Sequence, residues 1–238
     1  MNPQPNVAAV ASLIADPARA AMLMALADGR AHPAGELAYA ASVTAQTASS
    51  HLARLLAGGL LAVETEGRHR YYRLAGPQVA LVLENLASIG PAAALRRKPL
   101  TPEAQKLRFG RCCYDHLAGR LGVAVACGLQ ARGLLVAVAD KRFEVTPTGV
   151  EWFCRMGLDI TKIKPTRRGL ARQCLDWTER QHHLAGPLGV QFTALLCTKG
   201  WIRRMTSSRV VEVTPNGWSG LKDYLGVEMQ ALCSQLLP

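Results

Sequence analysis

The pattern of apolar and polar positions is clearest between residues 44 and 72. After Thr44, apolar residues recur at helical spacing and occupy one sector of a helical wheel: Ala45, Ala48, Leu52, Leu55 and Leu56. The opposite sector carries side chains that form hydrogen bonds: Gln46, Thr47, Ser50 and Arg54. Because Thr44 is a favourable N-cap and Gly58-Gly59 is a favourable C-terminal stop, the pattern predicts one amphipathic helix between them.

Two strands joined by a basic turn are predicted after this helix. The strands are residues 60–64 and 71–74, and the turn is the Glu-Gly-Arg-His-Arg segment at 66–70. Short or forked polar side chains suit base edges in a major groove, and arginines at a hairpin tip suit phosphates. An isolated helix with such a face is more often only solvated, but the hairpin favours a winged helix-turn-helix. The predicted DNA contacts are Thr44, Gln46, Thr47, Ser49, Ser50, His51, Arg54, Arg68, His69 and Arg70.

Residues 6–90 resemble the ArsR family of bacterial winged-helix repressors. The resemblance depends on five motifs in the family's order: Asp16-Pro17-Ala18-Arg19, Gly35-Glu36-Leu37-Ala38, Thr44 to Leu55, Gly59-Leu60-Leu61 and Gly67 to Tyr72. The first two motifs open the second and third helices of the family fold. Membership implies a homodimeric transcriptional repressor that binds a pseudo-palindromic double-stranded DNA operator and responds to an inducer.

The metal ligands familiar in that family are missing from this sequence. Metal-sensing members carry cysteines just after the Glu-Leu of the third helix, where this chain has Ala38, Tyr39 and Ala40. Other members carry His and Asp ligands on the fifth helix, and the corresponding segment 77–89 contains no histidine. The resemblance therefore leaves the inducer open.

Charge and composition fit a DNA-binding protein of the cytoplasm. The formal net charge of the 238 residues is +11, which suits a polyanionic partner. No basic-then-apolar leader opens the chain, and no apolar run approaches the ~20 residues that span a bilayer, so no membrane partner is expected. The seven cysteines lack the spacing of a secreted disulfide framework, so we expect free thiols.

An internal repeat occupies the second half of the chain. The segment His116 to Val123 reappears, 67 residues later, as His183 to Val190. The Val-Thr-Pro-x-Gly motif at 145–149 recurs at 213–217. Gly157-Leu158 then matches Gly226-Val227 at an offset of 69. Because the offset drifts by only two residues along the repeat, the pattern indicates a duplication.

Each copy has the same predicted order of elements. A helix ends at Gly133 or Gly200, a strand pair follows, and a Thr-Pro pair begins another helix. This order of helix, hairpin and helix matches the C-terminal part of a winged helix. The residues of the first helix in each copy are mostly small or apolar, so these helices are expected to pack closely and not to read bases. The predicted fold class is mainly α with small β-hairpins (α+β). It comprises a winged helix-turn-helix domain at 1–90, a linker at 91–102, and a regulatory domain at 103–238 of two winged-helix-like repeats, about 103–165 and 166–238.

Cysteine, histidine, acidic and aromatic residues gather at the start of each copy. The predicted effector residues are Cys113, Asp115, His116, Cys174, Trp177 and His183. Cys113 and His116, three residues apart, would share one face of a helix. A Cys/His set drawn from both copies suits a soft metal ion or a thiol sensor. The alternatives are free cysteines that only pack, a small-molecule effector, or no ligand. We expect the effector to bind between the copies.

An enzyme fused to an ArsR-like domain is the competing class of protein. Against it, the second half contains no nucleophile elbow, phosphate loop or dinucleotide fingerprint. Two small repeats also use its whole length. The sequence therefore favours a regulator over an enzyme.

Overall fold

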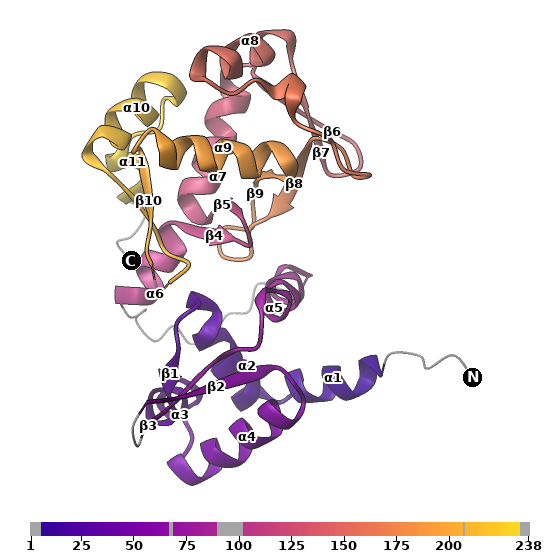
Figure 1. The fold of residues 1–238 in the computed structure, drawn as a ribbon, viewed down its shortest axis with the longest axis vertical. Helices are drawn as coiled ribbons and strands as arrows, with labels where there is room; N and C mark the ends of the chain where they lie inside the picture. The colour runs from indigo at the N-terminus through magenta and orange to yellow at the C-terminus, as the bar shows by residue number, and fades with distance from the viewer. Residues whose placement is uncertain (1–5, 67–68, 90–101, 207, 234–238) are drawn as a thin grey trace. The chain divides into compact units, whose positions relative to one another are not determined.

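The computed structural model describes residues 6–66, 69–89, 102–206 and 208–233 (Figure 1). They belong to two compact units, Met1–Ala87 and Ser88–Pro238, each with its own hydrophobic core. Of the predicted linker at 91–102, only Pro102 lies within the described residues. It is the first residue of a helix that the sequence does not predict.

The N-terminal unit has the element order of a winged helix-turn-helix. Its elements are α1 (Val7–Ile14), α2 (Pro17–Ala25), the 3-10 turn η1 (Leu26–Asp28), β1 (His32–Pro33), α3 (Ala34–Ala41), α4 (Ala45–Ala57), β2 (Leu61–Glu66), β3 (His69–Leu74) and α5 (Pro77–Ile89). The antiparallel sheet has the strand order β1-β3-β2. Helix α5, as predicted, covers 77–89, and its last residues cross the boundary between the units.

Helix caps and burial explain this arrangement. Asp16 accepts a hydrogen bond from the backbone N–H of Arg19 at 2.9 Å, and Thr44 accepts one from Thr47 at 3.2 Å. Helices α2 and α4 therefore begin where the sequence predicts. The core contains Met22, Leu23, Leu26, Leu37, Leu52, Leu55, Leu61, Tyr72 and Leu83. These contacts hold α4 with one face inward and the other in solvent.

Among the described residues, none of the helices has both the length and the apolar character needed to cross a membrane alone. The bent pair Val7–Ile14 and Pro17–Asp28 passes that test by length and composition only. The second helix of the pair contributes Met22, Leu23 and Leu26 to the core of its unit.

The C-terminal unit consists of short hairpins and helices. Its elements are α6 (Pro102–Phe109), β4 (Arg111–Cys113), β5 (His116–Ala118), α7 (Gly119–Ala131), β6 (Leu135–Val138), β7 (Arg142–Val145), α8 (Pro147–Met156), η2 (Ile160–Lys162), β8 (Ala171–Leu175), β9 (His182–Ala185), α9 (Gly186–Thr198), β10 (Ile202–Arg204), β11 (Val211–Val213), α10 (Pro215–Leu225) and α11 (Met229–Cys233).

The two copies of the repeat contain the same elements in the same order. Copy one consists of β4–β5, α7, β6–β7 and α8, and copy two consists of β8–β9, α9, β10–β11 and α10. Thr146 and Thr214 accept hydrogen bonds from the backbone N–H groups of Gly149 and Gly217, both at 2.9 Å. A proline follows each threonine, so α8 and α10 begin as the Thr-Pro pairs predict.

The start of each copy differs from the prediction. The sequence predicts helix around residues 113–123, but a hairpin precedes α7, and the helix begins only at Gly119. Tyr114, with φ of 62°, lies in the tight turn of that hairpin, and Gly119 has φ of 77°. A Cβ on Gly119 would lie 2.7 Å from the carbonyl oxygen of Arg108, so only glycine fits at this change of direction. Strands of three residues are too short to produce a clear period-2 pattern.

The copies interlock rather than pack as separate bodies. Strand β7 of copy one pairs with β8 of copy two, and Arg142 lies opposite Arg172. Both strands belong to the sheet β6-β7-β8-β9. The repeat relates β7 and β8 to β11 and β4, and an isolated β-bridge between Arg111 of β4 and Val210 beside β11 joins that second pair. Helix α7 contacts β9 and α9 contacts β5, so each helix packs on the other copy's hairpin. One continuous core therefore spans both copies.

Candidate functional site: a helix-and-wing face and a cysteine–histidine cluster

Helix α4 presents a polar face to solvent and an apolar face to the core. The exposed polar side chains are Gln46, Thr47, Ser49, Ser50 and Arg54. The buried side chains are Ala48, Leu52 and Leu55. Two members of the predicted apolar sector differ, because Ala45 is exposed in the first turn and Leu56 is only half-buried. The division into two faces otherwise follows the sequence.

Part of the polar face forms hydrogen bonds inside the helix. The hydroxyl oxygens of Thr44 and Thr47 lie 2.9 Å apart, and Ser49 donates a hydrogen bond to the carbonyl of Ala45 at 3.0 Å. Within the described residues, the α4 side chains that are exposed and hold no hydrogen bond are Gln46, Ser50 and Arg54. These are the groups best placed to bind something outside the chain.

His51 differs from its neighbours on α4. Its side chain is only 16% exposed, and its Nδ1 lies 3.8 Å from Oδ1 of Asp16 on the N-terminal side of α2. His51 therefore belongs to the packing of α4 near α2 and, unlike Gln46 and Ser50, is not exposed to solvent.

The wing strands are longer than the sequence predicts. Strands β2 and β3 pair from Leu61↔Leu74 to Glu66↔His69, so residues 66, 69 and 70 of the predicted turn at 66–70 lie in strands. Arg68 and the side chain of His69 fall outside the described residues. Arg70 is exposed, and its guanidinium lies 5.9 Å from the ring centroid of Tyr72, close enough for a cation–π interaction.

In the C-terminal unit, two hairpins each place a cysteine opposite a histidine. Cys113 pairs with His116 across β4–β5, and Cys174 pairs with His183 across β8–β9. The helical spacing proposed for Cys113 and His116 is wrong, because cross-strand pairing brings them together instead. The two Cys–His pairs are related by the repeat, although the connection between Cys174 and His183 is longer.

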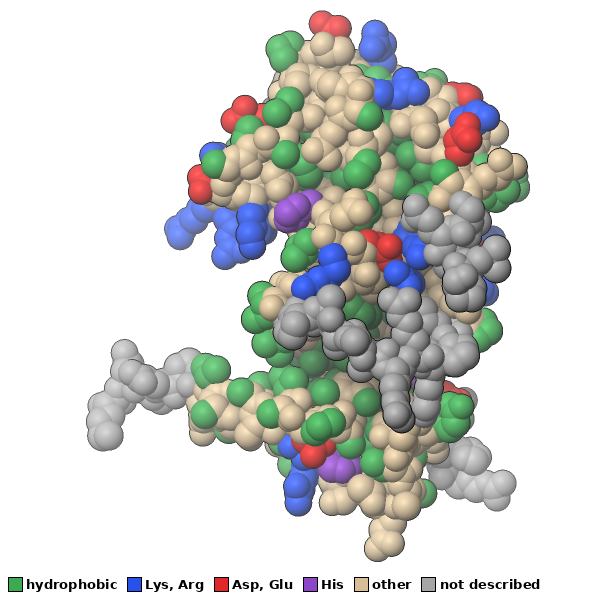
Figure 2. All heavy atoms as spheres, turned by 180° about the vertical axis from the view of Figure 1, so that it is seen from behind, with side chains coloured by type: hydrophobic (Ala, Val, Ile, Leu, Met, Phe, Trp, Pro, Cys, Tyr) green, Lys and Arg blue, Asp and Glu red, His purple; other side chains and the backbone are tan. Residues whose placement is uncertain are grey.

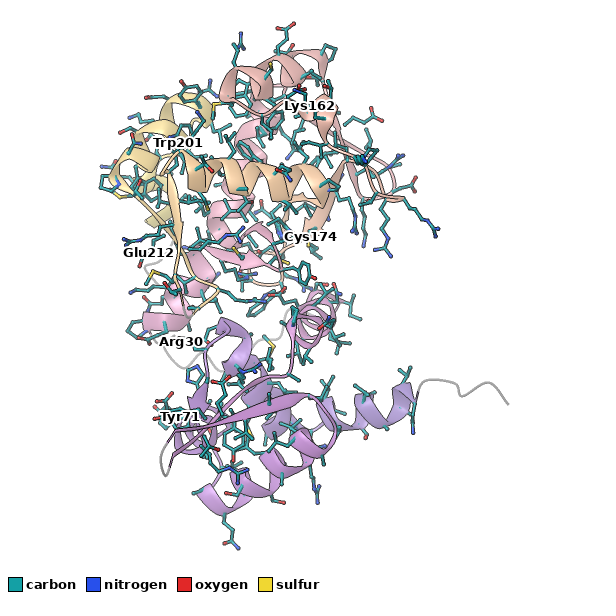
Figure 3. All side chains as sticks on the ribbon, in the orientation of Figure 1. Arg30, Tyr71, Lys162, Cys174, Trp201 and Glu212 are labelled. Carbon is teal, nitrogen blue, oxygen red and sulfur yellow. The ribbon has the colours of Figure 1, made fainter. Side chains whose placement is uncertain are left out.

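The two pairs meet where the copies join. Each of the four residues offers one ligand atom, and these atoms all lie within 4.8 Å of one another. Nε2 of His116 lies 3.2 Å from Nε2 of His183. Cys113 and both histidines are buried, and Cys174, labelled on β8 in Figure 3, is half-buried.

Each histidine has a carboxylate near its other ring nitrogen. Nδ1 of His116 lies 3.2 Å from Oδ1 of Asp115, and Nδ1 of His183 lies 3.6 Å from Oδ2 of Asp176, slightly beyond hydrogen-bond length. Burial lowers the pKa of His116, but hydrogen bonding with Cys113 and Asp115 outweighs it and holds that pKa above its usual value. Carboxylates beside Nδ1 leave both Nε2 atoms directed into the cluster.

Asp176 is the centre of a buried polar network that the sequence does not predict. Its carboxylate accepts hydrogen bonds from Arg111 at 2.9 and 3.0 Å and from the backbone N–H of Gly119 at 2.7 Å. Burial raises the pKa of Asp176, but Arg111, assisted by Thr178, His183 and Gly119, lowers it to about 2. An ionised Asp176 therefore connects copy two to copy one.

Trp177 and Asp115 surround the cluster without belonging to it. The guanidinium of Arg111 lies over the ring of Trp177, 5.1 Å from the centroid, and Asp115 faces Nδ1 of His116. The structure thus brings together Cys113, His116, Cys174 and His183, four of the six predicted effector residues. The Asp-x-Thr sequence at 176–178 is a turn motif that can be recognised in the sequence. The pairing of Asp176 with Arg111 cannot be recognised there, because 65 residues separate the two.

Two glycines allow the helices to approach the opposite hairpins. A Cβ on Gly122 would lie 2.5 Å from a backbone carbonyl oxygen of its own copy and 3.5 Å from Cβ of His183. A Cβ on Gly189 would lie 2.6 Å from the equivalent oxygen and 3.5 Å from Cβ of His116. The contact between each helix glycine and the opposite histidine is therefore the same in the two copies.

Comparisons with known proteins agree with this architecture. A family model described as a helix-turn-helix domain matches residues 14–64. The uncharacterized HTH-type transcriptional regulator YdfF of Bacillus subtilis (strain 168) is 45% identical over 225 residues, which cover 94% of this chain and 99% of that protein. The HTH-type transcriptional regulator CmtR of Mycobacterium tuberculosis (strain ATCC 25618 / H37Rv) is 38% identical over 76 residues, which cover 32% of this chain and 64% of that protein.

Among solved structures, the homodimeric winged helix-turn-helix DNA-binding domain of a candidate ArsR-family regulator from Mycobacterium bovis is 32% identical. The match covers 36% of this chain and 86% of that one, with a TM-score of 0.32. The similarity to YdfF extends over nearly the whole of both chains, including the duplicated unit. The chain therefore belongs to the HTH-type transcriptional regulators.

Proposed function

We propose that the chain is a homodimeric repressor that binds a specific double-stranded operator through α4 and the wing, and that its C-terminal unit regulates this binding. The observation that carries the proposal is the exposed face of α4, where Gln46, Ser50 and Arg54 hold no hydrogen bond within the described residues. Amide and guanidinium groups pair with adenine and guanine edges, and the hydroxyl of Ser50 suits either. Arg70 extends the same unit with a charge suited to phosphate.

A second copy of the chain would bury apolar side chains that this chain leaves in solvent. Helix α1 has no buried residue among its eight, and Val7 and Val10 are 71% and 40% exposed. Figure 2 displays hydrophobic side chains along the surface of this helix. Helix α5 exposes Leu81, Val82, Leu86 and Ile89. Burying such surfaces stabilises a dimer by roughly 25 cal/mol per Å² of apolar area before the costs of association.

DNA binding by the full chain tests the recognition face. Gln46→Ala and Ser50→Ala should each weaken binding to the preferred operator by about 1–3 kcal/mol and binding to random duplex much less. Gln191→Ala, an exposed change on α9, is the matched control and should leave both affinities unchanged. Equal losses on the two duplexes would contradict base reading by α4.

The salt dependence of binding tests the wing. Replacing Arg68 and Arg70 together by alanine should weaken binding to every duplex and reduce the salt slope by about one unit per lost phosphate contact. Lys164→Ala removes one exposed positive charge from the other unit and should leave the slope unchanged. An unchanged slope in the double variant would show that the wing does not contact phosphates.

Truncation tests the division of labour. The N-terminal unit has its own hydrophobic core, so a fragment ending at Pro99 should keep its preference for the operator. Its response to any effector should be lost. If a folded, dimeric fragment retains no sequence preference, the C-terminal unit takes a direct part in DNA binding, and the proposed division is wrong.

A further inference from the structure

We propose that Cys113, His116, Cys174 and His183 bind one divalent cation of the zinc and cadmium class, in tetrahedral coordination by two thiolates and two imidazoles. Each copy of the repeat supplies one thiolate and one imidazole, from paired positions of one hairpin. The proposal concerns ion binding by the C-terminal unit, and it stands whether or not the chain represses transcription.

The spacing of the four ligand atoms fits one ion. Two imidazole nitrogens bound to a tetrahedral zinc ion at about 2.0–2.1 Å lie about 3.3 Å apart. The two Nε2 atoms of His116 and His183 are already 3.2 Å apart. Two zinc-bound thiolates lie about 3.8 Å apart at bond lengths of about 2.3 Å. Because all four ligand atoms lie within 4.8 Å of one another, each pair is at most about 1.5 Å beyond the separation that one tetrahedral ion requires.

The ligand types select the class of ion. Thiolates and imidazoles together favour zinc, cadmium and similar ions, whereas magnesium and calcium prefer oxygen ligands. Two thiolates balance the charge of a divalent cation, so the four-ligand centre is neutral when loaded. Neutrality matters because Cys113, His116 and His183 are buried, and burying an unbalanced charge is costly.

The groups behind the histidines are those that metal sites require. Asp115 lies 3.2 Å from Nδ1 of His116, and Asp176 lies 3.6 Å from Nδ1 of His183. A carboxylate behind a ligating histidine fixes its tautomer and orientation and increases its basicity. Asp176 is itself fixed by Arg111, which is 1% exposed. An ion between the rings would replace the proton that two facing Nε2 atoms otherwise share.

Cobalt titration of the reduced full chain tests the site. Co²⁺ is the probe because tetrahedral cobalt with thiolate ligands has strong visible d–d and charge-transfer bands. We expect these bands to saturate at one ion per chain and to disappear when Zn²⁺ is added. Native mass spectrometry of the same samples should find one added ion.

Neighbouring cysteines on one strand provide the matched control. Cys113→Ser should abolish the charge-transfer intensity of one thiolate and weaken Co²⁺ binding by more than the roughly 10–100-fold typical of losing a second-shell partner. Cys112→Ser makes the same chemical change one position earlier, outside the cluster, and should bind Co²⁺ normally. Asp115→Asn keeps all four ligands and should weaken binding about 10-fold.

Three results would overturn the proposal. The first is a folded, reduced chain that gives no tetrahedral cobalt bands. The second is normal Co²⁺ binding by the folded Cys113→Ser variant. The third is a Cys113–Cys174 disulfide in the isolated protein whose reduced form takes up no cobalt, which would make the cluster a thiol switch. Circular dichroism of each variant separates loss of binding from loss of fold, and Cys174→Ser and His183→Gln repeat the test if Cys113→Ser does not fold.

Discussion

Arg111 and Asp176 form a buried ion pair between the two copies of the repeat. One guanidinium nitrogen, Nη2, lies 3.0 and 2.9 Å from the two carboxylate oxygens, and the side chains are 1% and 0% exposed. The same carboxylate accepts the backbone N–H of Gly119, at the start of α7. One side chain of copy two therefore fixes both the first hairpin and the first helix of copy one.

Removing the charge of Asp176 should destabilise the C-terminal unit strongly. Asp176→Asn removes the carboxylate charge that Nη2 of Arg111 meets at 2.9 and 3.0 Å, and breaking a buried ion pair in this way costs about 3–5 kcal/mol. Urea unfolding followed by tryptophan fluorescence measures the change. Asp140→Asn, at a side chain that is 83% exposed, is the control and should change stability by less than about 0.5 kcal/mol. A loss below about 1 kcal/mol for Asp176→Asn would mean that the pair contributes little.

Substitution of the two repeat-related glycines should have equal effects. A methyl group on Gly122 or Gly189 would lie 2.5 or 2.6 Å from backbone oxygen, so each alanine variant should lose about 1–3 kcal/mol of stability. Gly35→Ala, in α3 of the N-terminal unit with nothing within 4 Å, is the control and should be neutral or slightly stabilising. Denaturant midpoints measure all three. A large effect at only one of the repeat-related positions would contradict the symmetry of the copies.

Much of the N-terminal unit follows from local sequence. The N-caps Asp16 and Thr44 and the apolar positions Leu52 and Leu55 fix the ends and inward face of their helices through contacts within a few residues. The position of His51 does not follow, because a wheel places it near the polar face while Asp16, from another element, lies beside its ring. Tertiary contacts decide whether a side chain at the edge of the apolar sector of a helix is buried or exposed.

The C-terminal cluster was predictable in composition but not in geometry. The repeat predicts that His116 and His183 occupy equivalent positions, and this relation holds. The sequence predicts a helix at Cys113 and His116, but the two residues lie on paired strands. Strands of three residues are too short to give the alternation of polar and apolar positions that identifies a strand. Arg111 and Asp176 depend on pairing across 65 residues, which single-sequence patterns do not contain.

The stability of the N-terminal unit should decrease as pH rises from about 6.5, because of His32. Its Nε2 lies 3.1 Å from Asp28 and its Nδ1 lies 2.6 Å from Glu36. The hydrogen bond with Asp28 raises the pKa of His32, and burial opposes this only in part. The stabilisation is therefore complete below the unfolded pKa of about 6.5 and is lost as pH rises through the higher folded pKa.

Burial raises the pKa of Asp28, but hydrogen bonds from His32 and Arg30 outweigh this, so its pKa is lowered. Its contribution is present above its unfolded pKa of about 3.9 and is lost as pH falls through the lower folded value.

NMR titration should find the His32 midpoint above 6.5. After correction for intrinsic exchange, the protection of amides in the N-terminal unit against hydrogen exchange should decrease toward higher pH in the native chain, and much less in His32→Gln. Equal pH dependence in the two would show that another group is responsible.

Metal removal should destabilise the C-terminal unit, because the proposed ion joins strands from both copies. An ion that binds only the folded unit stabilises it by RT ln(1 + [L]/Kd), about 2.7 kcal/mol when free Zn²⁺ is 100-fold above Kd. Thermal unfolding of the reduced full chain should therefore shift upward with Zn²⁺ and return on addition of a chelator. The Zn²⁺-dependent increment should vanish in Cys113→Ser and persist in Cys112→Ser, even if both variants unfold at lower temperature without the ion. An equal increment in Cys113→Ser would place the stabilising ion elsewhere, and no increment in the native chain would argue against a resident metal.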